Sequence, residues 1–384
     1  MLPSKKRRPL MIIYEISITP ITPIHIGTGE DLMPFSYTLL KMSPQGQNYK
    51  YVRFNDERLV SFMTTDQIER LEALIAKDDF PHLRQTYNEI ACKIILSHQE
   101  CIFYLAEITN EILNLWQELE KRPQNSFVIQ PTICSLYTKK PYIPGSSIKG
   151  AIRTAILDPH AQEFAKTHKQ LKEQDMLSVI ECMRDQKYKA QADPLRALKI
   201  TDAIFPARDS RIVGQLALYN RVKGESENIA INEEVIKSAA ISSLCEGDNA
   251  EPITTTTTIA LDDRLIKKHP FRITPRSFQE IADRCNEFYE TALNKEYELF
   301  YRDAPDELYN GYKYIDDAFS NLNQEREFMA RLGCHSQIEY LTFSTERAPG
   351  KKAFETKTRT LFKYKNMLLP MGWVRCALVS EKEA

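Results

Sequence analysis

A short, stiff segment that leads into a helix, within residues 139–159, constrains the fold of this chain more than any other stretch. Two prolines and a glycine stiffen the approach, and the hydroxyl of Ser146 or Ser147 is placed to cap free amides of the helix that follows. The residues at four-residue spacing, which form one apolar stripe, are Ile148, Ile152 and Ile156. The spacing predicts a helix that starts near Gly145 and stops at Asp158 and Pro159.

The start of this helix combines features that suit an anion. Its first N–H groups lack partners within the helix, Lys149 and Arg153 lie on one neighbouring face, and Gly145 and Gly150 allow another backbone to come close. Such an end can hold a phosphate. It is not a nucleotide P-loop, because Lys149 precedes Gly150 instead of following it. The alternative is a capped helix packed on a sheet, with both cations merely solvated.

Alternating apolar residues predict a strand over residues 10–19, followed by a small, permissive loop over residues 22–31. The loop residues singled out are His25, Gly27, Thr28 and Gly29. His25 alone is more often structural than catalytic, although an imidazole can donate to phosphate or act as an acid or base.

Three segments resemble one known family. The sequence IPGSSIKGAIR at residues 143–153 looks like the helix motif of the RAMP superfamily, the RNA-binding proteins of CRISPR systems. The loop HIGTGED at 25–31 resembles the first loop of that superfamily, and LPMGWV at 369–374 resembles its closing segment. In this order and at this chain length, the segments look most like the subunits that cap the crRNA 3′ end in type III-A (Csm) effector complexes.

The resemblance implies two ferredoxin-like (RRM-like) domains, residues 1–210 and 211–384, with helical insertions near 55–122 and 160–192. The interspersed strand and helix patterns, without regular βαβ alternation, independently predict an α+β fold.

Several elements are predicted from the pattern. Further strands are expected at 35–40, 49–54, 128–133, 198–205, 212–219, 252–261 and 372–379, and helical faces at 68–75, 83–94, 112–119, 278–292 and 318–332. Residues 55–122 are expected to form an all-helical insertion, and an acidic connector is expected to join the strands at 212–219 and 252–261.

The resemblance further implies a non-catalytic RNA-binding subunit that binds the 3′ part of the crRNA, caps the backbone filament and contributes to crRNA 3′-end maturation in antiviral defence. The implied partners are crRNA, the neighbouring backbone RAMP subunit and other Csm subunits, with a host trimming nuclease as a further candidate. Candidate RNA-binding residues are His25, Gly27, Thr28, Gly29, Lys139, Lys140, Gly145, Ser146, Ser147, Lys149, Gly150, Arg153, Lys357 and Arg359.

Charge is segregated along a chain whose net charge is only −1. Residues 347–365 hold seven basic residues and one acid, whereas residues 225–263 hold nine acids and one base. This pattern suits one face on RNA and another on a protein or in solvent. Two solvated faces remain the alternative.

Other functions stay open. A metal-independent RAMP ribonuclease that cleaves CRISPR repeat RNA would need a base such as His25 and a cation such as Lys149, but no second histidine stands beside His25. A type III-B (Cmr) capping subunit and a protein-only scaffold are further alternatives. The glycine-rich loop expected near the C-terminus retains one glycine within 331–336, so the role of that loop is not carried over.

No cofactor or metal is predicted, because the cysteines stand singly and no histidine pair has zinc spacing. Neither an apolar run of membrane-spanning length nor a signal peptide is evident, so we expect a cytoplasmic protein with no membrane partner.

Overall fold

The computed structural model describes residues 11–42, 49–121, 127–167, 176, 193–206, 210–247, 250–268, 273–341, 343 and 356–383. The basic start of the chain, most of the predicted insertion at 160–192, and Arg347, Lys351 and Lys352 lie outside these residues. Within these ranges we find no helix with the length and apolar character of a membrane span.

The first strand, β1 (Met11–Pro20), lies in the middle of a five-stranded antiparallel sheet. The sheet order is β12 (Glu327–Arg331), β15 (Trp373–Glu383), β1, β11 (Thr255–Asp262) and β7 (Leu198–Ile200). Tyr14, Ile16 and Ile18 point into the core at every second position, as the alternation predicts. The first strand of the chain therefore pairs with its last.

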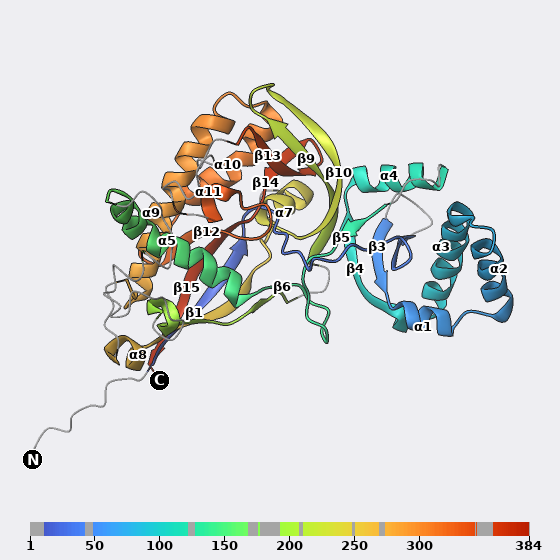
Figure 1. Cartoon of the computed structure of the whole chain (residues 1–384), viewed down its shortest axis with the longest axis horizontal. Coiled ribbons are helices and arrows are strands. Elements are labelled where there is room, and N and C mark those ends of the chain that lie inside the picture. Colours follow the sequence, from blue (N-terminus) through green and yellow to red (C-terminus); the bar gives the residue numbers. More distant parts are fainter. Residues whose placement is uncertain are drawn as a thin grey trace, which may run out of the picture.

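Two long helices cover this sheet (Figure 1). They are α5 (Gly145–Ala165) and α9 (Phe278–Glu296), and Tyr289 of α9 donates to the carbonyl oxygen of Ala151 at 3.3 Å. The core between helices and sheet includes the fully buried Trp373. The predicted stop at Asp158 and Pro159 is wrong, because α5 continues through Pro159 to Ala165. Leu157 and Ala161, on either side of the proline, are both buried in the core, and this packing supports the helix across it.

A second sheet has the order β14 (Met367–Pro370), β13 (Thr358–Tyr364), β9 (Arg211–Asn220), β4 (Ile102–Ile108), β3 (Tyr49–Phe54) and β2 (Tyr37–Lys41). The long strand β10 (Glu225–Ile236) pairs with β9, and the short β5 (Ile129–Gln130) pairs with β10. A separate two-stranded ladder joins β6 (Tyr142–Ile143) to β8 (Ala203–Ile204).

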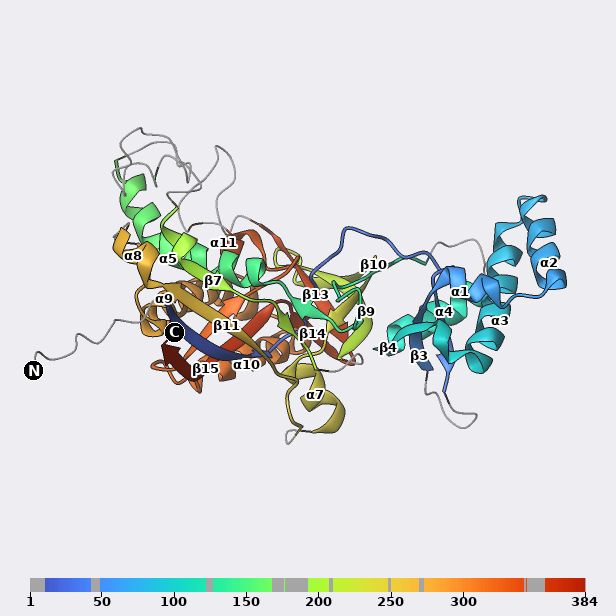
Figure 2. The same ribbon diagram turned by 90° about the horizontal axis from the view of Figure 1, so that it is seen from below.

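The insertion forms one end of an elongated molecule (Figures 1 and 2). Its helices are α1 (Asp56–Ser61), α2 (Thr65–Ile75), α3 (Phe80–Ser97) and α4 (Asn110–Lys121). It is not all helical, because β4 runs through it and joins β9 through a parallel pairing at Glu107 and Ile108. Its apolar residues pack with those of β2 and β3 in two clusters, one of which also includes Val213 of β9.

Several strands differ from the prediction. Residues 225–236 form β10 instead of a connector, and the helix expected at 318–332 is replaced by the end of α10 (Asp306–Ser320) and by β12. The short helices α7 (Ala239–Glu246), α8 (Asp263–Lys268) and α11 (Ile338–Leu341) complete the α-helices of the described residues. The α+β prediction is confirmed, and helices packed on mainly antiparallel sheets agree with ferredoxin-like architecture. The boundary at residue 210 stays a prediction, although strands from both sides of it share both sheets.

Candidate nucleic-acid interface

The loop that follows β1 is held in place by a buried residue at one end and is exposed over the residues that follow. His25 is buried, and its Nδ1–H donates to the Glu234 carbonyl oxygen at 2.8 Å. Gly27, Thr28 and Gly29 lie exposed on the surface, where Gly29 takes a φ of 79°. His25 therefore positions the loop, and the three small residues after it form the surface that a ligand backbone can approach.

The loop at residues 331–336 packs directly on this first loop. Gly333 has a φ of 93°, and a Cβ there would lie 2.3 Å from the His25 carbonyl oxygen. The same oxygen accepts a hydrogen bond from the Cys334 amide at 2.9 Å. The single glycine that this segment retains therefore makes a close backbone contact within the protein.

The closing motif meets the first loop as well. The amide of Gly372 donates to the Pro23 carbonyl oxygen at 2.8 Å, and the amide of Trp373 donates to Thr22 Oγ1 at 3.1 Å. The closing motif thus lies buried against the backbone that leads into the first loop, more than 300 residues away in the sequence.

A buried carboxylate joins two histidines beneath this surface. His335 Nε2 donates to Glu233 Oε1 at 2.8 Å, and His25 Nδ1 lies 3.8 Å from Glu233 Oε2. The ring centroids of the two histidines are 6.4 Å apart. His335 supplies the second histidine that the sequence does not place beside His25.

The N-terminus of α5 is occupied by the protein itself. The amide of Gly145 donates to Asp202 Oδ1 at 2.8 Å, and a Cβ on Gly145 would lie 2.3 Å from the Ile200 carbonyl oxygen. Asp202 thus takes the place that the sequence offered to a phosphate. Ser146 and Gly150 are exposed, whereas Ser147 is half-buried.

The two cations of this helix also have protein partners. Lys149 Nζ donates to the Leu198 carbonyl oxygen at 2.7 Å, and burial lowers the pKa of its ammonium. Arg153 Nη1 pairs with Asp193 Oδ2 at 2.9 Å. Both side chains therefore hold α5 against the segment that leads into β7.

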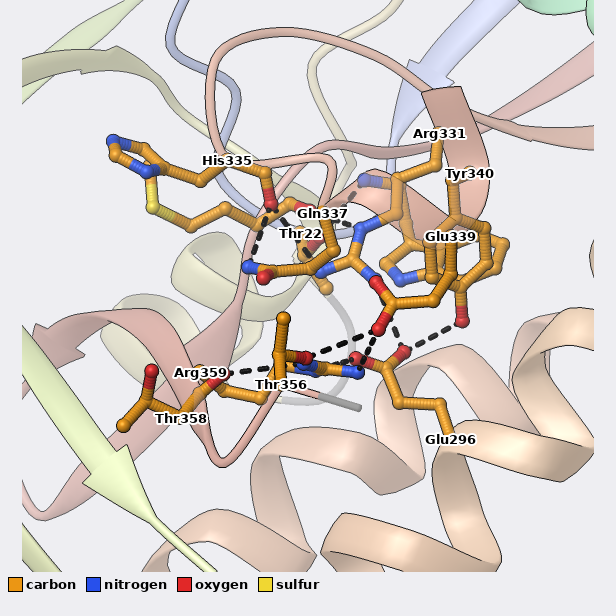
Figure 3. Close-up of polar contacts among 12 residues, drawn as sticks. Thr22, Glu296, Arg331, His335, Gln337, Glu339, Tyr340, Thr356, Thr358 and Arg359 are labelled. Carbon is orange, nitrogen blue, oxygen red and sulfur yellow. Dashed lines mark hydrogen bonds and ion pairs between the residues drawn. The ribbon is translucent and has the colours of Figure 1, made fainter. Parts of the chain in front are cut away.

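Of the two candidate RNA-binding residues predicted near the C-terminus, one is exposed and the other is buried. Lys357 is exposed, but Arg359 is fully buried, with Nε 2.6 Å from Glu296 Oε1 and Nη2 3.0 Å from Glu339 Oε1 (Figure 3). Arg359 therefore cannot reach a phosphate in this conformation.

Arg359 belongs to a buried charge cluster that the sequence did not indicate (Figure 3). Arg331 Nη1 and the Tyr340 hydroxyl donate to Glu296 Oε2, at 3.0 and 2.6 Å. Burial acts to raise the pKa of Glu296, but Arg331 and Arg359 outweigh it and hold that pKa below its ordinary value. The cluster joins α9, β12, α11 and β13 at the base of the 331–336 loop.

A second buried ion pair lies under the first loop. Arg211 Nε lies 2.7 Å from Glu234 Oε1, and the Tyr104 hydroxyl donates to Glu234 Oε2 at 2.9 Å. Burial raises the pKa of Glu234 to about 7, against the opposing effect of Arg211. Arg211 also donates to the carbonyl oxygen of Lys139, so this pair supports the turn at residues 134–140.

Lys139 and Lys140 are half-buried at the end of that turn, and Lys139 Nζ lies 4.2 Å from the centroid of the Phe103 ring. Among the residues that the structure describes, no group of three or more histidine, cysteine, aspartate or glutamate side chains is arranged to hold a metal ion.

Comparison with known proteins places the chain in a family. Residues 17–306 match the model of the RAMP superfamily. No curated protein matches the sequence.

Two solved structures share the fold. A chain of the Csm–crRNA–target RNA ternary complex of a type III-A CRISPR–Cas system aligns with a TM-score of 0.60 at 19% identity, over 95% of this chain and 100% of that one. Csm5 of T. onnurineus aligns with a TM-score of 0.53 at 19% identity, over 93% of this chain and 99% of that one. Since the family model spans most of the sequence, the chain belongs to the RAMP superfamily.

Proposed function

We propose that this chain is a non-catalytic RNA-binding subunit of a type III-A CRISPR effector complex. In this proposal it holds the 3′ part of the crRNA, ends the filament of backbone subunits and contributes to crRNA 3′-end maturation in antiviral defence. Membership of the RAMP superfamily and the fold likeness, over nearly the whole chain, to Csm5 and to a chain of a Csm–crRNA complex support it.

The observation that carries the proposal is the exposed part of the first loop, which the 331–336 loop and the buried closing motif support from within the protein. Gly27, Thr28 and Gly29 are exposed there, and the position of the loop is fixed by the hydrogen bond of His25 and by the contact of Gly333 with the His25 carbonyl oxygen. Small residues and backbone amides contact a sugar–phosphate chain without reading its bases. A subunit that accepts any spacer sequence needs this kind of contact.

Lys139, Lys140 and Lys357 are the cations that we assign to phosphates. Lys149, Arg153 and Arg359, whose charged groups are held by protein oxygens, are assigned to the architecture of the site instead.

A test is titration of the full chain with labelled single-stranded RNA, between about 50 and 200 mM salt. Replacing Lys139, Lys140 and Lys357 by alanine should weaken binding and reduce the slope of log K against log salt by about two. Alanine at three exposed lysines outside this surface, Lys267, Lys313 and Lys382, provides the matched control. Absence of salt-dependent binding by the unaltered chain would leave the protein-only scaffold.

The second candidate is a metal-independent ribonuclease, favoured by the 6.4 Å approach of His25 and His335. A general base must reach the proton that it removes, and the burial of His25 beneath Gly27 opposes this role. RNA cleavage at one position, lost in both His25→Ala and His335→Ala, would replace our proposal with this one.

A further inference from the structure

The turn between β5 and β6 presents two apolar side chains to solvent. Tyr137 is 94% exposed and Leu136 is 80% exposed, more than any other large apolar side chain in the described residues. The turn projects from the body of the molecule beside β6 (Figure 1). Two adjacent apolar side chains with this exposure offer a contact surface to a partner.

Hydrogen bonds hold the backbone of the turn in place, although the side chains at its tip are exposed. The Ser135 amide donates to the Lys140 carbonyl oxygen and the Lys139 amide to the Ser135 carbonyl oxygen, both at 2.9 Å. Ser135 Oγ accepts from the Thr138 amide at 3.3 Å, and Arg211 secures the Lys139 carbonyl oxygen from below. The backbone of the tip is therefore already ordered, and binding through Tyr137 costs little further backbone entropy.

The charge of the segment that forms the turn favours an anionic partner. No aspartate or glutamate occurs between Glu120 and Asp158, a stretch that contains Lys139 and Lys140. An aromatic ring close to two lysines, in a segment without acidic residues, is a combination that binds single-stranded nucleic acid, where bases stack on rings and phosphates contact ammonium groups.

The turn also continues the proposed RNA surface. The Ile133 amide donates to the Ile26 carbonyl oxygen at 2.8 Å, and Gly27 pairs with Thr132 in an isolated bridge. A strand of RNA that passes over residues 27–29 is thereby led along the base of the turn.

We propose that Tyr137 stacks on one unpaired base of the bound RNA, with Leu136 beside it and Lys139 and Lys140 facing the flanking phosphates. The ligand is single-stranded RNA, bound without base preference because every base offers a ring face. The inference rests on the proposed function and adds to it the place where a base, rather than a phosphate, is held.

The experiment uses the full chain and a set of short single-stranded RNAs, each with 2-aminopurine at one position. We expect the fluorescence of one position to be quenched on binding. Tyr137→Ala should remove that quenching and weaken binding roughly 5- to 100-fold. Tyr137→Phe should retain both, because its ring stacks equally well.

Tyr137→Leu separates stacking from apolar docking. If a base stacks on the ring of Tyr137, the leucine variant should lose quenching and affinity as the alanine variant does. The salt dependence of binding should remain that of the unaltered chain. All three substitutions lie on a solvated tip, so thermal unfolding should not change.

Two results would overturn the inference while leaving the proposed function intact. In one, Tyr137→Ala binds and quenches as the unaltered chain does. In the other, Tyr137→Ala keeps its RNA affinity but loses assembly with the neighbouring backbone subunit, which would make the tip a protein contact. Failure of the unaltered chain to bind RNA at all would instead reject the proposed function, and the inference with it.

Discussion

Gly333 links two loops that lie more than 300 residues apart in the sequence. Its left-handed backbone and its contact with the His25 carbonyl oxygen leave no room for a side chain. The sequence shows only that one glycine remains in a segment where several were expected. It does not show that this glycine contacts the protein's own first loop, because no local pattern encodes that approach.

Gly333→Ala should lower the free energy of unfolding by about 1–3 kcal/mol, since both its backbone conformation and its contact oppose a Cβ. Gly150→Ala is the matched control, because Gly150 lies in α5 with nothing within 4 Å of its Cβ position. That control should gain about 0.5–1 kcal/mol through helix propensity. Equal urea midpoints for Gly333→Ala and the unaltered chain would contradict the close contact.

Glu296 is the centre of the buried charge cluster. Glu296→Gln should lower the free energy of unfolding by about 3–5 kcal/mol, because Arg331 and Arg359 would keep buried charges without their shared carboxylate. Glu287→Gln, on the same helix but exposed, should change it by less than about 0.5 kcal/mol. Urea unfolding at neutral pH measures both, and a small loss for Glu296→Gln would reject the cluster as a structural support.

The pH dependence of stability gives a second measure of Glu296. Its pKa in the folded state lies below the ordinary value of 4.5, so its contribution is fully present above that value. The contribution is lost as the pH falls through the folded-state pKa. The unaltered chain should therefore lose more stability on acidification than Glu296→Gln, and parallel pH curves would be the contrary result.

Arg359 and Lys149 show the limit of sequence reasoning at this scale. Both were selected as phosphate contacts for their charge, yet both are held by protein oxygens. Their partners, Glu296 and the Leu198 carbonyl oxygen, lie about 50 residues or more away in the chain. The exposed residues 27–29 could be placed from the sequence, because a small, polar loop directly after a strand is a local signal.

At the scale of elements, strongly periodic segments were predicted well and interrupted ones poorly. The alternation in β1, the threonine run of β11 and the apolar face of α9 each gave the observed element. β10 was missed because its first half is exposed and acidic, and only its last five residues are buried. β4 was missed because it lies between helices of the insertion.

The helix α2 is the least supported of the longer helices in the described part of the chain. It has no buried residue, and its capping box at Thr64 and Gln67 is a local device. α9, in contrast, buries ten residues along its length. Helices with little buried surface open locally far below the free energy of global unfolding.

We therefore expect amide hydrogens of α2 to exchange much faster than those of α9, as measured by hydrogen exchange with mass spectrometry. The cap variant Thr64→Ala should speed exchange in α2 further without changing exchange in α9. Equal protection of the two helices would contradict the packing described here.

At the scale of the whole molecule, the pairing of strands could not be derived from the pattern. β1 lies between β11 and β15, and β4 meets β9 through two residues only. Periodicity identifies a strand but not its neighbours, so no strand pairing was predicted. The ferredoxin-like architecture was expected only from the resemblance of three short motifs to the RAMP superfamily. The structure places the closing motif against Thr22 and Pro23, directly before the first-loop motif.

The central claim is that the exposed residues 27–29 and the neighbouring turn at residues 134–140 hold the 3′ part of the crRNA at the end of the filament. The most direct test is photo-crosslinking in the assembled complex, with 4-thiouridine placed in turn along the crRNA and the linked peptides identified by mass spectrometry. The account predicts crosslinks from the 3′ part to peptides that contain residues 27–29 and 137–140. Crosslinks to this subunit only from the 5′ part, or from the 3′ part to other surfaces of the chain, would contradict it.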